Sequence, residues 1–259
     1  MKITFLGTGT SYGVPVIGCN CAVCTSTDPH NKRTRSSVLI SHEGHNILID
    51  ASTDLRQQAL REGLRNIDAV LCTHVHADHV FGMDDLRAFN DIQRSAIPYY
   101  AKKEDIEQLR DIFHHIFEPV PQIGGGLPKI DLKEIDPNKP LKLFGLTIIP
   151  IEIMHGIVPI LGYRIGAFAY LTDCSKIPES SFEKLKGVEY LVLDALRHKP
   201  HSTHFSIEEA IAAAQRIGAK QTYFTHIAHN LEYSQTNKEL PKGIELAYDG
   251  LVLEIKDRA

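Results

Sequence analysis

The sequence lacks the features that mark membrane-spanning and secreted proteins. Nowhere in its 259 residues does an apolar run approach about eighteen residues, the length that a membrane-spanning helix needs. The N-terminal MKITFLGTGTSYG has the pattern of a strand, and it contains neither the apolar core nor the cleavage site of a signal peptide. We therefore expect a cytoplasmic protein that does not associate with membranes.

Basic charge is not in excess either. Lysine and arginine number 28, aspartate and glutamate number 32, and the formal net charge is −4. This balance argues against general nucleic-acid binding, which relies on an excess of basic residues. Apolar residues make up 43% and charged residues 23% of the chain, as in ordinary globular proteins. No linker, repeat or low-complexity tract interrupts the sequence, so we expect one domain over residues 1–259.

Cysteine is scarce and unevenly placed. The five cysteines are an odd number without regular spacing, which argues against a disulfide scaffold. Three of them lie in the heptapeptide GCNCAVC, namely Cys19, Cys21 and Cys24. The other two, Cys72 and Cys174, lie in apolar strand patterns and are expected to be core thiols. In a reduced compartment, clustered cysteines more often bind metal or take part in catalysis.

Strand and helix patterns alternate along the chain. Apolar and β-branched residues predict strands at 2–7, 36–41, 45–50, 67–73, 98–101, 141–153, 161–173, 189–196 and 221–226, and helical spacing predicts helices at 53–64, 103–117 and 206–218. The pair Asp249-Gly250 predicts a hairpin between IELAY and LVLEI. This mixed order indicates a layered α/β protein.

Four side chains of metal-binding types occur close together in the segment THVHADH. They are His74, His76, Asp78 and His79, and they follow an apolar strand. In extended backbone the first two point the same way, whereas the last two follow one turn on and face a second ion. Imidazole nitrogen and carboxylate oxygen suit zinc, manganese or iron. The segment therefore predicts a metal site.

THVHADH resembles the H-x-H-x-D-H signature of the metallo-β-lactamase superfamily. The later ligands of that family have counterparts in the expected order: His155 in IEIMHG, Asp173 in YLTD and His226 in YFTH. FLGTGTS near the start and ILIDAS before the motif also resemble the family. The resemblance spans nearly the whole chain. It implies an α/β fold of the metallo-β-lactamase type, a four-layer αββα sandwich, and a hydrolase.

The resemblance also implies two divalent active-site ions, manganese or zinc. The implied ligands are His74, His76 and His155 for one ion and Asp78, His79 and His226 for the other, with Asp173 bridging them. Such a pair of ions clamps the attacking and leaving oxygens of a phosphoryl transfer. We expect Asp78 to be essential for catalysis as well. Asp50, in ILIDAS, is expected to orient a ligand histidine without binding metal itself.

A further histidine is a candidate proton donor. His204 directly precedes a predicted helix, with Ser206 as its expected N-cap. In phosphodiesterase branches of the superfamily, a histidine at a similar place is thought to protonate the leaving oxygen, a task that suits imidazole. His198 and His201 are alternatives for this role. The segment GTGTSYG lacks the following helix that a dinucleotide-binding loop requires.

The cysteine cluster needs a fourth ligand to form a closed zinc site. Three thiolates and one imidazole complete a tetrahedral structural site. We predict one structural zinc ion bound by Cys19, Cys21, Cys24 and His229. The imidazole follows His226 by three residues in THIAH, so one loop would present a histidine to each site. The alternative, a redox pair of Cys21 and Cys24, lacks a thioredoxin-like context.

GCNCAVC, THIAH and the ending LPKGIELAYDGLVLEI resemble one branch of the superfamily, the cyclic phosphodiesterases of the phosphonate-degradation (carbon–phosphorus lyase) pathway. This branch implies a small-molecule phosphate ester as substrate, such as a phosphoribosyl 1,2-cyclic phosphate, and a homodimer. Two alternatives stay open. One is a cofactor-biosynthesis metal-binding protein like that of pyrroloquinoline quinone synthesis. The other is an RNA 3′-processing nuclease, which expects a basic arm, whereas the loop at 118–130 is short and scarcely basic.

Overall fold

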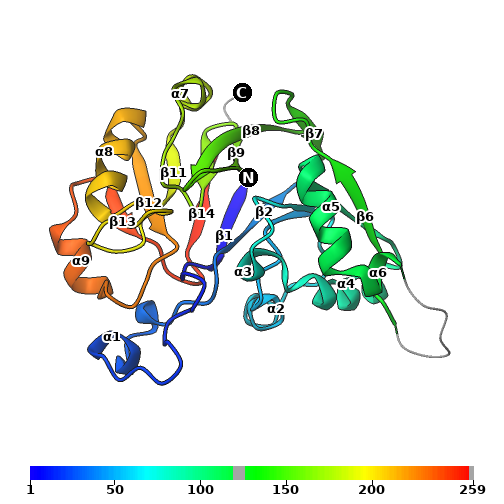
Figure 1. Cartoon of the computed structure of the whole chain (residues 1–259), viewed down its shortest axis with the longest axis horizontal. Coiled ribbons are helices and arrows are strands. Elements are labelled where there is room, and N and C mark those ends of the chain that lie inside the picture. Colours follow the sequence, from blue (N-terminus) through cyan, green and yellow to red (C-terminus); the bar gives the residue numbers. More distant parts are fainter. Residues whose placement is uncertain (119–125, 257–259) are drawn as a thin grey trace.

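Two facing β-sheets covered by helices make up the computed structural model, which describes residues 1–118 and 126–256 (Figure 1). The first sheet has the order β14-β1-β2-β3-β4-β5-β6 and the second β13-β12-β11-β10-β9-β8-β7. The strands are β1 (Lys2–Gly7), β2 (Ser37–His42), β3 (His45–Ile49), β4 (Ala69–Leu71), β5 (Ile97–Ala101), β6 (Ile130–Glu134), β7 (Leu141–Leu143), β8 (Leu146–His155), β9 (Val158–Ile165), β10 (Phe168–Leu171), β11 (Tyr190–Asp194), β12 (Gln221–Thr225), β13 (Ile244–Leu246) and β14 (Val252–Glu254). The helices are α1 (Ala22–Thr25), α2 (Leu55–Glu62), α3 (Ala77–Val80), α4 (Leu86–Gln93), α5 (Lys103–Ile112), α6 (His114–Phe117), α7 (Glu179–Leu185), α8 (Ile207–Ile217) and α9 (Tyr233–Glu239), with 3-10 turns at Pro29–Asn31 and Met83–Asp85.

Alternating side chains on the strands bury both faces of each sheet. On β3, Ile47 and Ile49 pack between the two sheets, whereas Leu48 packs on the opposite face under the helices. The second sheet packs against the helices of the other side through a third apolar cluster. Three buried clusters therefore separate four layers, and the predicted αββα sandwich is confirmed.

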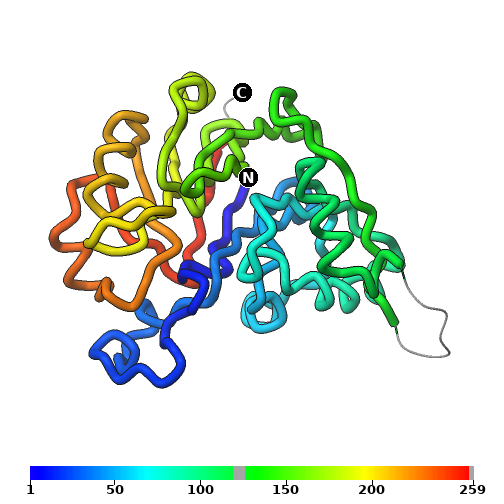
Figure 2. Tube along the Cα trace, in the orientation of Figure 1, coloured from blue at the N-terminus to red at the C-terminus, as the bar shows by residue number. Residues whose placement is uncertain are grey.

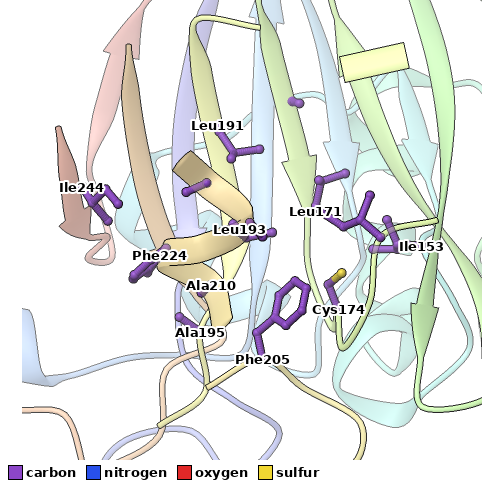
Figure 3. Close-up of a cluster of buried hydrophobic side chains, with 14 of the residues drawn as sticks. Ile153, Leu171, Cys174, Leu191, Leu193, Ala195, Phe205, Ala210, Phe224 and Ile244 are labelled. Carbon is purple, nitrogen blue, oxygen red and sulfur yellow. The ribbon is translucent and has the colours of Figure 1, made fainter. Parts of the chain in front are cut away.

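Helix α8 shows how the outer layer attaches to the second sheet. Ser206 and Glu209 form a capping box at its start, and Gly218 ends it with a φ of 74°, a left-handed conformation that glycine adopts readily. Its Ala210 lies among Leu193 of β11 and Phe224 of β12 (Figure 3). The predicted helix at 206–218, including its N-cap, is confirmed.

The hairpin predicted at Asp249-Gly250 is wrong. β13 pairs with β12 in the second sheet, whereas β14 pairs with β1 in the first. The Asp249 carboxylate accepts hydrogen bonds from the backbone N–H and hydroxyl groups of both Thr8 and Thr34. These long-range bonds hold the turn where the chain crosses from one sheet to the other.

Two other predictions differ from the structure. The predicted helix at 103–117 is divided into α5 and α6, because Phe113 adopts φ −109° and ψ 38° and buries its ring in the core. Of the loop predicted at 118–130, residues 119–125 lie outside the described residues, and Ile130 begins the unpredicted strand β6.

The N-terminal segment that follows β1 lies against the chain that follows β12 (Figure 2). Gly9 and Ile227 form a parallel bridge, and Thr10 N–H donates to the Ile227 carbonyl at 3.2 Å. Residues more than two hundred positions apart thus share one end of the molecule. Within the described ranges, every helix is too short or too polar to cross a bilayer.

Candidate active site

The predicted metal ligands come together at one edge of the two sheets. They lie at the C-terminal ends of four strands: His74, His76, Asp78 and His79 after β4, His155 at the end of β8, Asp173 after β10 and His226 after β12. Because β4 belongs to the first sheet and the others to the second, the site lies where the sheets meet. Asp173 and His226 both have a φ of 58°, a left-handed conformation that is unfavourable for non-glycine residues and typical of functional sites.

Four of these residues form a first group. Their ligand atoms all lie within 4.8 Å of one another, and they belong to His74, His76, His155 and Asp173. His74 Nε2 lies 3.0 Å from His76 Nδ1 and 3.7 Å from Asp173 Oδ2. His76 is exposed and the other three are buried, so the group meets solvent at His76.

A second group shares Asp173 with the first. It contains Asp78, His79, Asp173 and His226, all buried. His79 Nε2 lies 3.2 Å from both Asp78 Oδ2 and Asp173 Oδ1. His226 Nε2 lies 3.5 Å from Asp78 Oδ2 and 3.4 Å from Asp173 Oδ2. The Asp173 carboxylate therefore occupies the position predicted for a ligand that bridges two ions.

Hydrogen bonds behind the two groups orient their imidazoles. His79 Nδ1 lies 2.7 Å from Asp50 Oδ2, and Thr73 donates its backbone N–H and its hydroxyl to the same carboxylate, each at 2.8 Å. His155 donates its Nδ1–H to the Thr203 carbonyl at 2.8 Å. In both rings Nε2 then faces the groups, as in metal-binding histidines. The predicted contact between Asp50 and a ligand-type histidine is confirmed.

The donor atoms fit a pair of divalent cations. His79 Nε2 is buried and has no hydrogen-bond partner among the described residues, although two carboxylate oxygens lie 3.2 Å away. A buried nitrogen left without a partner is costly, and a cation between these atoms removes that cost. Imidazole nitrogens together with carboxylate oxygens suit zinc, manganese and iron.

Burial and mutual contact shift the pKa values of the two groups. Burial lowers the pKa of His74 well below its usual value, and His79 adds to the effect. Burial would raise the pKa of Asp173, but His226 and His79 outweigh it and hold this pKa well below its usual range. His79 itself is desolvated, yet Asp173 and Asp78 raise its pKa well above the usual value. The buried carboxylates therefore favour positive charge among them, which divalent cations supply when bound.

His204 and Asp194 form a pair directly beside the second group. His204 Nδ1 lies 2.7 Å from Asp194 Oδ2, and both side chains are buried. The His204 ring stacks on His226 at 4.6 Å between centroids and meets His155 edge-on at 4.7 Å. Burial raises the pKa of Asp194 and lowers that of His204, so charge is disfavoured on both partners and a proton shared between them is favoured. His201 lies farther out and is exposed.

The cysteine cluster is assembled as predicted for a zinc site. His229 Nδ1 lies 3.3 Å from the Sγ atom of Cys19 and 3.5 Å from those of Cys21 and Cys24. A tetrahedral zinc site with ordinary bond lengths separates sulfur and nitrogen by about 3.6 Å. The Cys24 backbone N–H donates to Cys21 Sγ and lowers the pKa of that thiol to about 6, whereas burial raises the pKa of Cys24 to about 11. The four donors fit one zinc ion.

A buried arginine holds the loop that carries His229. Arg33 is 1% exposed, and its guanidinium donates to the carbonyls of Ala228 at 3.5 Å and Leu231 at 3.0 Å. These carbonyls flank His229 on either side. The loop between the two candidate metal sites is therefore anchored from the N-terminal segment.

Comparison with known proteins identifies the family. Residues 45–227 match the model of the β-lactamase superfamily domain. The chain belongs to this superfamily. Among solved structures, a diphosphatase from the PhnP family is similar, with 46% sequence identity, a TM-score of 0.91, and coverage of 97% of this chain and 96% of that one. The fold is thus that of a β-lactamase superfamily hydrolase.

Two curated relatives carry other names. An octanoyltransferase of Porphyromonas gingivalis is 43% identical over 261 residues, which cover 100% of this chain but only 52% of that protein. The chain described here therefore spans about half the length of that relative. A coenzyme PQQ synthesis protein B of Methylorubrum populi is 30% identical over 224 residues, 75% of this chain and 72% of that protein.

One residue of the site, Asp194, was not predicted from the sequence. The available signal was its position: Asp194 is the last residue of the apolar strand β11, and Asp173 follows the end of the apolar strand β10 in a similar way. Its partner His204 lies at the site, whereas His198 and His201, the alternatives to it, are exposed. Cys72 and Cys174 are fully buried, so the expectation that they are core thiols is confirmed.

Proposed function

We propose that this protein is a metal-dependent hydrolase that cleaves a phosphorus–oxygen bond in a small phosphodiester or diphosphate, such as a phosphoribosyl cyclic phosphate. The observation that carries the proposal is the imidazole of His204, held at 2.7 Å by buried Asp194 and stacked on His226. Metal ligands alone fit many hydrolytic reactions. A buried imidazole beside them adds a proton donor for a leaving oxygen.

Two divalent cations in these groups would supply Lewis acidity toward a phosphoryl oxygen and make a nucleophile from water. The residues of the chain do the rest. Asp50 and the Thr203 carbonyl bind Nδ1 of His79 and His155, so Nε2 of each ring is left free to hold a cation. When the His204 imidazole is protonated, it would donate Nδ1–H to Asp194 and Nε2–H to the departing oxygen. Burial lowers the pKa of His204, which favours release of that proton.

The PhnP-family diphosphatase supports phosphorus chemistry, and it widens the substrate class beyond cyclic esters. In both a phosphodiester and a diphosphate the nucleophile attacks the phosphorus atom of a phosphoryl group. They differ in the leaving group, which is an alkoxide in the first case and a phosphate in the second. An alkoxide is far more basic, so the need for His204 should be larger for the ester.

Transfer of an octanoyl group is not part of the proposal, because this chain covers only 52% of the Porphyromonas protein. Cleavage of RNA 3′ ends is not favoured by the net charge of −4. The 30% identity to a PQQ synthesis protein B supports a second candidate, a metal-binding protein of cofactor assembly. A homodimer and a small-molecule substrate are parts of the proposal for the hydrolase.

Turnover of bis(4-nitrophenyl) phosphate, a cyclic phosphate and a dialkyl diphosphate by the metal-loaded protein tests the proposal. We expect hydrolysis that a chelator abolishes and that Asp78→Ala reduces by several orders of magnitude. His204→Ala should lower kcat roughly 100-fold or more for the ester with an alkoxide leaving group. His198→Ala, an exposed histidine of the same connection, is the matched control and should keep full activity. Absence of turnover on every substrate, with metal bound, would favour the cofactor-assembly candidate.

A further inference from the structure

A cavity of about 300 Å³ is lined by His204 and by none of the seven residues of the two metal-ligand groups. Its walls come from three segments, residues 10–16, 196–204 and 228–230, and it ends at His229 of the cysteine cluster. Backbone hydrogen bonds join the walls: Thr10 N–H donates to Ile227, and Ala228 N–H donates to Leu196 at 3.0 Å. The cavity is therefore built into the fold by segments distant in sequence.

An aromatic ring on one wall is exposed rather than packed. Tyr12 is 72% exposed, and it lies in a turn in which the Gly13 N–H donates a hydrogen bond to the Thr10 carbonyl at 2.7 Å. Arg35 Nε donates to the Ser11 carbonyl at 3.1 Å and ties the same turn to the body of the protein. A ring held on a fixed turn loses little entropy when a planar group stacks on it.

Another segment that lines the cavity carries positive charge. Arg197 donates through Nε to the Lys199 carbonyl and through Nη2 to the Pro200 carbonyl, each at 3.1 Å, which fixes its guanidinium. Its Nη1 has no hydrogen-bond partner among the described residues. None of the described residues that line the cavity is acidic. This wall therefore favours an anionic group.

We propose that this cavity binds the leaving group of the substrate, and that this group is a nucleotide whose base stacks on Tyr12 and whose phosphate faces Arg197. The inference rests on the proposed function, because the cavity begins at the imidazole that would protonate the departing oxygen. Its volume is at the lower end of the range for ligand pockets, so it holds one nucleotide and not a polymer. A diphosphate diester that bears a nucleoside combines these features.

Calorimetric titration of the zinc-loaded protein with AMP and with ribose 5-phosphate tests the assignment without turnover. Both probes carry a phosphate on ribose, and only AMP has a base. Stacking of one base on an aromatic side chain should make AMP bind roughly 5- to 150-fold more tightly. Tyr12→Ala should remove this difference, and Tyr12→Phe should retain it because the ring stays. Leu60→Ala, at an exposed apolar residue outside the cavity, is the control and should change neither affinity.

Arg197→Gln should weaken AMP binding roughly 10-fold or more while binding of uncharged adenosine stays the same, since a hydrogen bond to a charged group is lost. Equal affinities for AMP and ribose 5-phosphate, or an AMP affinity that survives Tyr12→Ala, would overturn the cavity assignment. Hydrolysis of bis(4-nitrophenyl) phosphate together with that result leaves the proposed function intact. AMP binding through Tyr12 without turnover of any substrate overturns the proposed function instead.

Discussion

Replacing Asp194 with asparagine tests the proposed proton donor, His204, without changing a predicted metal ligand. Asparagine keeps the shape of the side chain but removes the carboxyl group that shares a proton with His204 Nδ1 at 2.7 Å. A hydrogen bond to a charged group contributes roughly 1.5–3 kcal/mol. If this whole contribution acts on the protonated imidazole, Asp194→Asn should lower kcat roughly 10- to 150-fold. This loss in kcat should appear for substrates whose leaving oxygen must be protonated.

Two esters of the same phosphorus provide the assay. An alkyl 4-nitrophenyl phosphate releases a weakly basic phenolate, whereas a dialkyl or cyclic phosphate releases an alkoxide. We expect kcat of Asp194→Asn to fall mainly for the alkoxide, with bound metal unchanged by elemental analysis. Asp131→Asn, an exposed aspartate on strand β6, is the matched control. An equal loss on both esters with full metal content would refute the reasoning, because the carboxylate would then act on a step common to both.

Three further changes test other parts of the structure. Asp50→Ala removes the carboxylate 2.7 Å from His79 Nδ1, so metal affinity measured against a competing chelator should fall roughly 10- to 100-fold; an unchanged affinity contradicts the orienting role. Cys21→Ser should lose about one zinc per chain and lower the Tm, and retention of both contradicts the structural zinc site. Burial raises the pKa of Asp105 from 3.8 to about 6, so the free energy of unfolding falls as pH rises from 3.8 to about 6 and stays lower above that pH. Asp105→Asn should therefore be more stable by up to about 3 kcal/mol in urea unfolding at pH 8, with a smaller gain at pH 5. An equal effect at both pH values contradicts the assignment.

The metal-ligand groups were predictable because four of the residues lie close together in THVHADH and the resemblance to the superfamily implied the other three. The four residues of THVHADH lie within six positions after an apolar strand, and each later ligand ends or follows a strand of its own. Strand ends that meet at one edge of a sandwich bring such residues together. The layered α/β class was predictable from the order of strand and helix patterns along the chain, whereas the four-layer sandwich was implied by the resemblance to the superfamily.

The features that the sequence did not predict depend on contacts between residues that are far apart in the chain. Asp194 ends β11 as one acidic residue without a neighbouring ligand, and only the return of the chain at His204 gives it a partner. The turn at Asp249-Gly250 looks like a hairpin locally. Its strands join different sheets because the Asp249 carboxylate is held by Thr8 and Thr34.

The cysteine cluster and the metal-ligand groups are linked by one short loop, so the two candidate metal sites lie close together. His226 contacts the Asp173 carboxylate, and His229, three residues later, contacts the thiolates. The cavity beside His204 lies between them, with Tyr12 on the segment that leads to Cys19. Zinc bound to the thiolates would therefore fix a wall of the cavity and leave the reacting atoms untouched. On this view the cluster governs which substrates fit, and loss of its zinc should weaken nucleotide binding more than the turnover of a small ester.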